Sequence, residues 1–233
     1  MPRRRERRPG PTAVETLVER LHSEILSGAI GLGAPLREEE IAERFDLSRH
    51  TVRGAFARLA EQRLVTLEPY RGARVAQFDD AALIAMQQLR GALETEAVRL
   101  LRDRHGSRWP ERITERISAA LDRLGAAEDA GEWGRTLRAH GAVHQAIVDA
   151  AESPRIAEEY ARLDGETMLM LSEIRIEYPR GSLVAEHRAY AQALIDEGEG
   201  LVRTHLAHST ELIRAARAED ARPRPQPGPD PSP

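Results

Sequence analysis

Residues 36–74, LREEEIAERFDLSRHTVRGAFARLAEQRLVTLEPYRGAR, decide the fold of the N-terminal part of this chain. Two short segments carry apolar residues at helical spacing, and a tight turn at Asp46 separates them. A short polar side chain tolerates the left-handed backbone of such a turn, and Ser48 is a favoured N-cap for the second segment. The pattern therefore predicts a helix-turn-helix. The inner faces of its two helices would be formed by Ile41, Ala42 and Phe45 and by Val52, Phe56 and Leu59.

The segments on either side of this motif complete a winged domain. Downstream, the run LVTL, the turn EPYRG and the run ARVA predict a β-hairpin with a basic tip. Upstream, residues 12–27 form an amphipathic helical pattern that stops at Gly28. A helix-turn-helix with a wing is typical of DNA-binding proteins, because its second helix presents side chains to base edges and phosphates. The expected DNA contacts are Ser48, Arg49, His50, Thr51, Arg53, Arg71 and Gly72.

Charge is divided unevenly along the chain. The formal net charge of all 233 residues is -4. Residues 1–78 hold 14 arginines and 11 acidic residues, a net charge of +3, whereas residues 79–233 hold 20 arginines and 27 acidic residues, a net charge of −7. A basic front and an acidic back fit a protein that binds nucleic acid at one end. The chain has no cysteine, which excludes disulfides and thiolate metal sites.

The sequence divides into four regions. We expect a disordered basic arm over residues 1–11, a winged helix-turn-helix domain over residues 12–78, an all-α domain over residues 79–217 and a disordered proline-rich tail over residues 218–233. The basic arm has no apolar segment behind it, so it does not resemble a secretory signal. No apolar run approaches the length of a membrane span. The sequence predicts a cytoplasmic protein without a membrane partner.

The region after residue 79 is helical in pattern almost to its end. Breaks fall at the glycine, serine and proline clusters, and no strand is predicted. The fold class is therefore mainly α, an N-terminal winged helix-turn-helix followed by a helical bundle. The expected helices are 80–104, 109–130, 133–152, 154–177, 182–197 and 199–217.

The first bundle helix places a charged pair on its apolar face. Arg90 and Glu94 lie one turn apart between Met86 and Ala97, so both point inward. Burial of a guanidinium is costly without a carboxylate partner. Two interpretations stay open at this point. Arg90 and Glu94 could form an ion pair with each other within the helix, or Arg90 could anchor a carboxylate ligand.

Histidines lie on the inward faces of three further helices. His140 and His144 are spaced one turn apart on one helix, His187 lies on the next-to-last helix, and His205 and His208 lie on the last. A single inward histidine is usually a core residue with satisfied hydrogen bonds. Several neutral imidazoles that converge in a bundle suit zinc, nickel, copper, iron or manganese. By spacing alone, a core cluster and a metal site are both open.

Beyond these patterns, the chain resembles transcription regulators of the GntR superfamily, FadR subfamily, which carry a ligand-binding FCD domain. Ser48-Arg49-His50-Thr51-Val52-Arg53 resembles the family's Ser-Arg-x-x-Val-Arg core, and the N-terminal likeness extends over the whole winged domain. The chain departs from the family at Asp46, where a glycine is usual, and at Glu39, where a basic residue is frequent. The second departure implies that one phosphate contact is missing.

The C-terminal resemblance covers residues 79–217. Arg90-Gly-Ala-Leu93-Glu94 resembles the family's Arg-x-x-Leu-Glu, and the segments at His144, His187 and His205 resemble its three histidine segments. In metal-binding members an aspartate four residues before the first histidine completes the ligand set, and this chain has His140 there. The resemblance implies a divalent metal on His144, His187 and His205, with His140 either a fourth ligand or no ligand. Four neutral donors would favour zinc or nickel over manganese.

The resemblance also implies a homodimer, a palindromic double-stranded operator and a small organic acid as effector. We therefore predict a ligand-responsive transcription regulator, a repressor rather than an enzyme, with Arg90 as charge partner of the effector. A metal-dependent hydrolase is one alternative, since histidines and water on zinc also form a hydrolytic site. A DNA-binding protein whose bundle only dimerises is the other.

Overall fold

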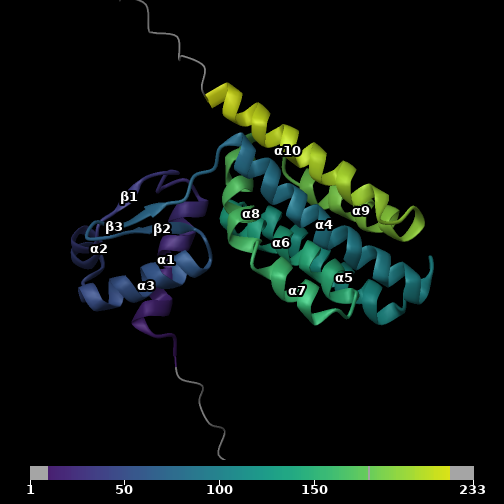
Figure 1. Ribbon diagram of the computed structural model, residues 1–233, viewed down its shortest axis with the longest axis horizontal. Coiled ribbons are helices and arrows are strands. Elements are labelled where there is room, and N and C mark those ends of the chain that lie inside the picture. Colours follow the sequence, from purple (N-terminus) through teal and green to yellow (C-terminus); the bar gives the residue numbers. More distant parts are fainter. Residues whose placement is uncertain (1–9, 178, 221–233) are drawn as a thin grey trace, which may run out of the picture.

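The computed structural model describes residues 10–177 and 179–220 and contains two units side by side (Figure 1). The N-terminal unit has three helices and a small sheet. The C-terminal unit is a bundle of helices, in which α10 (Gly200–Asp220) runs along the outer edge. Residues 1–9 of the predicted arm (1–11) and residues 221–233 of the predicted tail (218–233) lie outside the described residues, whereas residues 218–220 were wrongly assigned to the tail and form the end of the last helix. No helix of the described ranges is both long and apolar enough to cross a membrane.

The winged unit agrees with the sequence pattern and adds one strand to it. Strands β1 (Pro35–Leu36), β2 (Val65–Glu68) and β3 (Gly72–Val75) lie in the order β1-β3-β2, with both pairs antiparallel. The sequence had predicted only the β2-β3 hairpin. The short β1 escaped prediction because two residues carry no periodic signal. The elements of the winged unit are, in chain order, α1 (Ala13–Leu26), β1 (Pro35–Leu36), α2 (Glu38–Phe45), α3 (Arg49–Glu61), β2 (Val65–Glu68) and β3 (Gly72–Val75).

The turn of the helix-turn-helix has the predicted local chemistry. Asp46 adopts the left-handed conformation, with φ 51° and ψ 51°, at the C-terminal end of α2. The Ser48 side chain accepts a hydrogen bond from the backbone N–H of Thr51 and so caps α3. Val52, Phe56 and Leu59 of α3 are fully buried. The predicted helix-turn-helix is thus confirmed, and its second helix is fixed against α1.

The bundle differs from prediction in one place. The pattern predicted a single helix over residues 154–177, but the chain changes direction at Arg162 and Leu163 and ends in a 3₁₀ turn. No proline lies inside this stretch, so the break left no sequence signal. The elements are α4 (Asp80–His105), α5 (Glu111–Ala130), α6 (Trp133–Ala150), α7 (Pro154–Ala161), α8 (Asp164–Leu171), η1 (Ser172–Glu177), α9 (Ser182–Asp196) and α10 (Gly200–Asp220).

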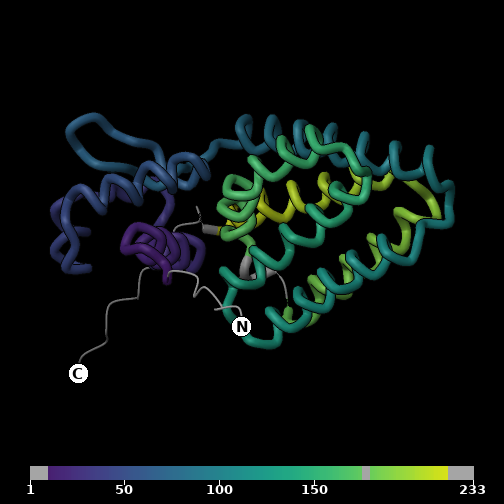
Figure 2. The backbone as a smooth tube through the Cα atoms, turned by 90° about the horizontal axis from the view of Figure 1, so that it is seen from below, coloured from purple at the N-terminus to yellow at the C-terminus, as the bar shows by residue number. Residues whose placement is uncertain are grey.

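The two units share one apolar core. Buried residues of α1 and α3 belong to the same cluster as Leu137 of α6, Met168 and Leu169 of α8 and Ile213 of α10. Figure 2 shows α1 on the side of the winged unit that faces the bundle. A second cluster, formed by α4, α5, α6, α9 and α10, fills the far part of the bundle. The winged unit is therefore packed on the bundle rather than tethered to it by the linker alone.

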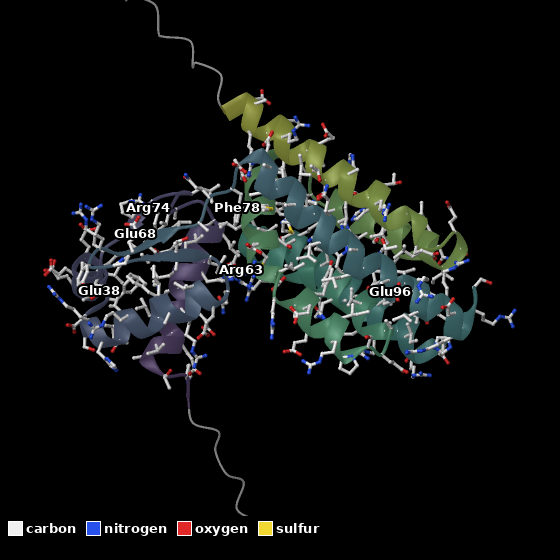
Figure 3. The ribbon with its side chains drawn as sticks, viewed as in Figure 1. Glu38, Arg63, Glu68, Arg74, Phe78 and Glu96 are labelled. Carbon is white, nitrogen blue, oxygen red and sulfur yellow. The ribbon has the colours of Figure 1, made fainter. Side chains whose placement is uncertain are left out.

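Close backbone contact and two polar pairs hold the junction. A Cβ atom at Gly165 would lie 1.9 Å from the carbonyl oxygen of Gln62, so only glycine allows α8 to meet the end of α3 this closely. Arg63 lies at the junction in Figure 3 and forms an ion pair with Glu166 at 3.0 Å. Nη1 of Arg138 on α6 lies 3.2 Å from Nδ1 of His22 on α1.

Candidate DNA-binding surface and metal centre

A surface hollow of ≈ 790 Å³ lies between α2, the start of α3 and the wing. It faces away from the bundle, because Glu38, Glu68 and Arg74 of its rim lie on the far side of the winged unit in Figure 3. Helix N-termini and cations are the usual partners of phosphates. The lining residues are Pro35, Arg37, Glu38, Glu39, Arg49, Arg53, Glu68, Tyr70, Arg71, Gly72 and Arg74.

The recognition helix presents its predicted cations at this hollow. Arg49 is the first residue of α3 and Arg53 follows one turn later, so the two side chains share a face. Both line the hollow, and both are exposed. Arg53 forms no ion pair with any described residue, whereas Arg49 is paired with Glu39 of α2. His50 is exposed beside them but does not line the hollow.

The hydroxyls of Ser48 and Thr51 are already engaged with each other. Ser48 Oγ lies 2.9 Å from Thr51 Oγ1 and also accepts from the Thr51 backbone N–H at 3.1 Å. Their first role in the structure is to start α3. Both keep one further donor or acceptor for DNA, because a hydroxyl has one proton and two lone pairs. Their DNA contacts stay a prediction.

The wing tip carries one predicted cation and one aromatic residue that sequence reasoning missed. Arg71 lines the hollow together with Tyr70, a fully exposed side chain on a backbone with φ 63°. Gly72 has φ 96°, and a Cβ there would lie 2.3 Å from the carbonyl oxygen of Leu36. Gly72 thus allows β3 to pair with β1, and this explains the glycine without any contact to DNA. Its predicted DNA contact stays untested.

The bundle brings the predicted histidines into one cluster. His140, His144 and His187 are buried, and each offers a ring nitrogen such that the three atoms lie within 4.8 Å of one another. The ring centroid of His205 lies 4.9 Å from that of His187 and 5.3 Å from that of His144. Three helices, α6, α9 and α10, contribute these side chains.

Hydrogen bonds fix which nitrogen of two rings carries the proton. Nδ1 of His187 lies 2.8 Å from the carbonyl oxygen of Leu183, which can only accept, so Nδ1 is the donor and Nε2 carries the lone pair. Nδ1 of His144 lies 2.9 Å from Oε1 of Glu94, which assigns the same tautomer to His144. The two Nε2 atoms face each other at 3.2 Å. Two lone pairs at this distance repel each other unless a cation lies between them.

Burial keeps all four imidazoles neutral. It lowers the pKa of His140 and of His144 well below the usual range, and the neighbouring rings and Arg90 lower both further. Burial also lowers the pKa of His187 to about 4 and that of His205 to about 2. A metal-binding histidine must be neutral, so the cluster is ready for a metal across the physiological pH range. Nδ1 of His140 has no hydrogen-bond partner among the described residues, so this nitrogen is also available as a metal ligand.

Glu94 is the centre of the hydrogen-bond network behind the histidines. It is fully buried and accepts from the hydroxyl groups of Tyr160 at 2.7 Å and Tyr190 at 2.8 Å, besides its contact with His144. Burial raises the pKa of both tyrosines well above the usual value, so both keep their protons. Outer partners of this kind orient the ligand ring. Helical periodicity places Tyr190 on the inward face with His187, but neither tyrosine contact with Glu94 was predicted, because each tyrosine lies on a helix far in sequence from Glu94.

Arg90 is buried as predicted, but its partner differs from the simple helical pair. Its Nε donates to the hydroxyl of Tyr160 at 2.8 Å, and that hydroxyl donates on to Glu94. Arg90 also lines a small cavity that it shares with three of the histidines. Only about 10 Å³ of this cavity is open to the centre of a water molecule, which is room for about one water. The cavity residues are Arg90, Trp133, Leu137, His140, Leu171, Ile174, Leu183, His187, His205 and Ser209.

One predicted inward histidine is not inward. His208 was placed on the same face as His205, but it is exposed, and the neighbouring Ser209 is buried instead. Position 208 lies three residues after His205, and the apolar face of α10 is too narrow to cover both. His205 itself is mostly buried. Its ring stacks on that of Tyr190 with centroids 4.0 Å apart, and its Nδ1 lies 3.5 Å from Oε1 of Glu186.

Two comparisons of sequence place this architecture among known proteins. Residues 13–75 match the profile of bacterial regulatory proteins of the gntR family, and residues 85–212 match the FCD domain. The chain is 28% identical over 185 residues to a protein of Paenarthrobacter nicotinovorans described as a probable D-xylose utilization operon transcriptional repressor. That match covers 79% of this chain and 80% of the relative.

Solved structures share the fold. A GntR transcriptional regulator from Rhodococcus sp. RHA1 superposes with a TM-score of 0.64 at 23% identity, over 91% of this chain and 99% of that one. McbR/YncC of E. coli superposes with a TM-score of 0.65 at 19% identity, over 91% of this chain and 100% of that one. The arrangement of winged unit and bundle thus recurs in both.

Proposed function

The chain belongs to the GntR family of bacterial regulatory proteins with an FCD domain, and on this premise we propose that it is a repressor whose histidine cavity holds a divalent metal and senses a small organic acid. Its activity is ligand-responsive, DNA-binding transcription regulation. The proteins it matches are transcription regulators, which favours this function over a metal-dependent hydrolase. The repressor assignment follows the description of the relative from Paenarthrobacter.

The facing Nε2 atoms of His144 and His187 carry the metal proposal. The network assigns a lone pair to both, and both rings are buried with their Nε2 atoms 3.2 Å apart. A cation between them would turn the repulsion into two bonds. His140 and His205 would be the further ligands, and four neutral nitrogen donors suit zinc or nickel better than manganese. The metal would supply a positive centre at which a carboxylate can bind.

Arg90 supports an anionic effector. A guanidinium is always charged, and only its Nε is hydrogen-bonded to another described residue, through Tyr160. Arg90 lines the cavity together with His140, His187 and His205. A carboxylate is the group that such a fork binds best. Because the cavity has room for about one water, an organic acid can enter only after a wall element moves.

The segment α8–η1 is the wall element that links the cavity to the winged unit. Leu171 and Ile174 close the cavity from one side. Gly165 and Glu166, at the start of the same segment, touch Gln62 and Arg63 at the end of the recognition helix. An acid that displaces η1 would therefore change the position of α3. Binding that differs between two arrangements shifts their populations, and the affinity for DNA shifts with them.

The groove between α4 and α10 supports a homodimer. It has a volume of ≈ 480 Å³, and Ile84 on α4 is an exposed apolar side chain that lines it. Arg203 and Glu211, two turns apart on α10, both line it. A two-fold axis would place Arg203 of one copy against Glu211 of the other, because a two-fold interface is self-complementary. A dimer would present two recognition helices to a palindromic operator.

Elemental analysis tests the metal proposal. Protein purified without chelator and then offered zinc, nickel and manganese should retain about one equivalent of zinc or nickel per chain. A panel of metabolite acids should then raise the melting temperature of the loaded protein, because a ligand that binds only the folded state stabilises it. Protein that retains none of the three metals would contradict the proposal, and the bundle would then only dimerise.

A further inference from the structure

Glu39 is an acidic residue on the DNA-binding surface that the proposed function has not used. It lies in the first turn of α2, lines the same hollow as Arg49 and Arg53, and forms an ion pair with the Arg49 guanidinium. Both side chains are more than half exposed, 68% for Glu39 and 58% for Arg49. The Arg49 guanidinium, a group at the start of the recognition helix that could bind a DNA phosphate, is thus already paired with a carboxylate of the protein.

Stabilisation of α2 explains only part of this acidic run. Glu38, Glu39 and Glu40 all lie in the first turn of α2, whose N-cap makes no side-chain hydrogen bond. Negative charge at a helix N-terminus is favourable, and Glu40 also pairs with Arg37 at 3.1 Å. However, a carboxylate on a surface that meets DNA phosphates weakens binding by repulsion. Glu39 differs from Glu40 in two ways, because it lines the hollow and because its partner belongs to the recognition helix.

The number of donors on Arg49 decides what the pair can bind. A guanidinium has five N–H groups in a planar fork, and Glu39 engages the Nη2 end. The other donors are sufficient for the O6 and N7 acceptors of a guanine, which is uncharged at this edge. A phosphate on the same guanidinium would bring a second anion close to the Glu39 carboxylate. The Arg49–Glu39 pair can therefore bind a base edge, but it disfavours the binding of a phosphate.

We propose that Glu39 is a specificity-determining residue that reserves Arg49 for a guanine edge and excludes DNA phosphate from it. This inference rests on the DNA-binding function of the winged unit and not on the metal centre. Glu39 acts through Arg49, so it is a positioning residue. The consequence is low affinity for DNA of arbitrary sequence. The many competing sites of a genome would otherwise draw the regulator away from its operator.

The test compares Glu39→Gln with the wild-type full-length protein on two probes. One probe is the duplex that the wild type selects from a randomised pool, and the other is a duplex of scrambled sequence. Glu39→Gln should bind the scrambled duplex roughly 3- to 10-fold more tightly, and its salt slope should grow by about one unit because Arg49 gains a phosphate. Affinity for the selected duplex should change less, so that the ratio of the two affinities falls.

Glu40→Gln is the matched control, because it removes the same charge from the same helix turn and releases Arg37, another arginine of the hollow, while Arg49 keeps its partner Glu39. Glu39→Gln placed in an Arg49→Gln background should no longer change the salt slope. Melting temperatures show that each variant is folded. The proposal is overturned if Glu39→Gln and Glu40→Gln change scrambled-duplex affinity equally, or if Glu39→Gln lowers affinity for the selected duplex alone. A wild type that selects no preferred duplex would instead contradict sequence-specific DNA binding itself.

Discussion

The winged unit and the histidine cavity solve opposite electrostatic problems. On the winged unit the functional groups are exposed arginines, and carboxylates such as Glu39 and Glu68 hold them in place. In the bundle the candidate functional groups are buried imidazoles that stay neutral, and hydrogen bonds to the buried Glu94 carboxylate and to the Leu183 carbonyl orient His144 and His187. The first surface is built for contact with a polyanion in salt water, where each pair contributes little. The second lies at low dielectric, where each group would contribute more to binding of the proposed small charged ligand.

The two regions meet at α8–η1, and in the proposed function this shared segment would connect the buried site to the exposed one. Its start touches the recognition helix, and its end closes the cavity. Arg217 of α10 holds η1 through a two-point ion pair with Glu173, at 2.7 and 2.8 Å. Variants that affect only one region, or only the segment between them, can therefore separate the two functions.

Removal of a cavity histidine should have the largest effect. His187→Ala removes a ring whose tautomer is fixed by Leu183, and we expect metal affinity to fall by at least about 100-fold, beyond the loss typical of outer partners. The effector response should disappear, since the cavity then lacks its charged centre. Isothermal titration with zinc measures the loss. His208→Ala is the matched control, because that ring is exposed on α10 and its removal should change nothing.

A change at the junction should have the next largest effect. Gly165→Ala places a Cβ atom 1.9 Å from the Gln62 carbonyl oxygen, so the winged unit must move away from α8. We expect a loss of about 1–3 kcal/mol in the free energy of unfolding, with metal affinity retained. Urea unfolding and small-angle scattering report the loss and the larger separation of the units. At Gly125, a Cβ would meet Val184 at an ordinary 3.6 Å, so Gly125→Ala should not destabilise the protein.

Loss of the wing cation should weaken DNA binding without changing its sequence preference. Arg71 lies at the tip of the wing, where phosphate or the minor groove is within reach. Arg71→Ala should lower affinity for selected and scrambled duplexes to the same extent and reduce the salt slope by about one unit. Fluorescence anisotropy over a salt series measures both quantities. A loss confined to one base position would show that the wing reads sequence.

The smallest effect concerns acid stability of the junction. Burial and the nearby Arg138 lower the pKa of His22 from the usual 6.5 to about 4. The unfolded chain therefore binds more protons between these two values, and the free energy of unfolding falls as pH is lowered through this window. His22→Gln removes this contribution while it keeps an acceptor for Arg138. Melting curves from pH 7 to pH 4 should show a smaller acid loss for the variant, and parallel curves would contradict the assignment.

The same two regions differ in how far the sequence could predict them. The recognition helix was predictable, because its cap, its turn and its cations lie within a few residues of Ser48. The inward positions of His140, His144, His187 and His205 followed from helical periodicity, which fixes faces well. Other features depend on packing between distant segments. The sequence did not predict that Tyr160 and Tyr190 meet at Glu94, nor that the chain breaks before Gly165 where α8 meets α3.

His208 shows the limit of periodicity for a single residue. Its spacing from His205 placed it inward, but how much of a helix is covered is set by the neighbours and not by the helix itself. The pairing of Glu39 with Arg49 was likewise not predicted by periodicity. It depends on how the turn at Asp46 positions α2 relative to α3. Faces are local properties of a sequence, whereas partners are properties of the fold.

Control of DNA affinity by the histidine cavity is the central claim, and one titration tests it most directly. Metal-loaded wild type and His187→Ala are each titrated onto the selected duplex, with and without the acid that most raises the melting temperature of the wild type. The account predicts that the acid changes the dissociation constant of the wild type about 5- to 150-fold and leaves that of His187→Ala unchanged. An equal change in both proteins, or no change in the wild type, would contradict it.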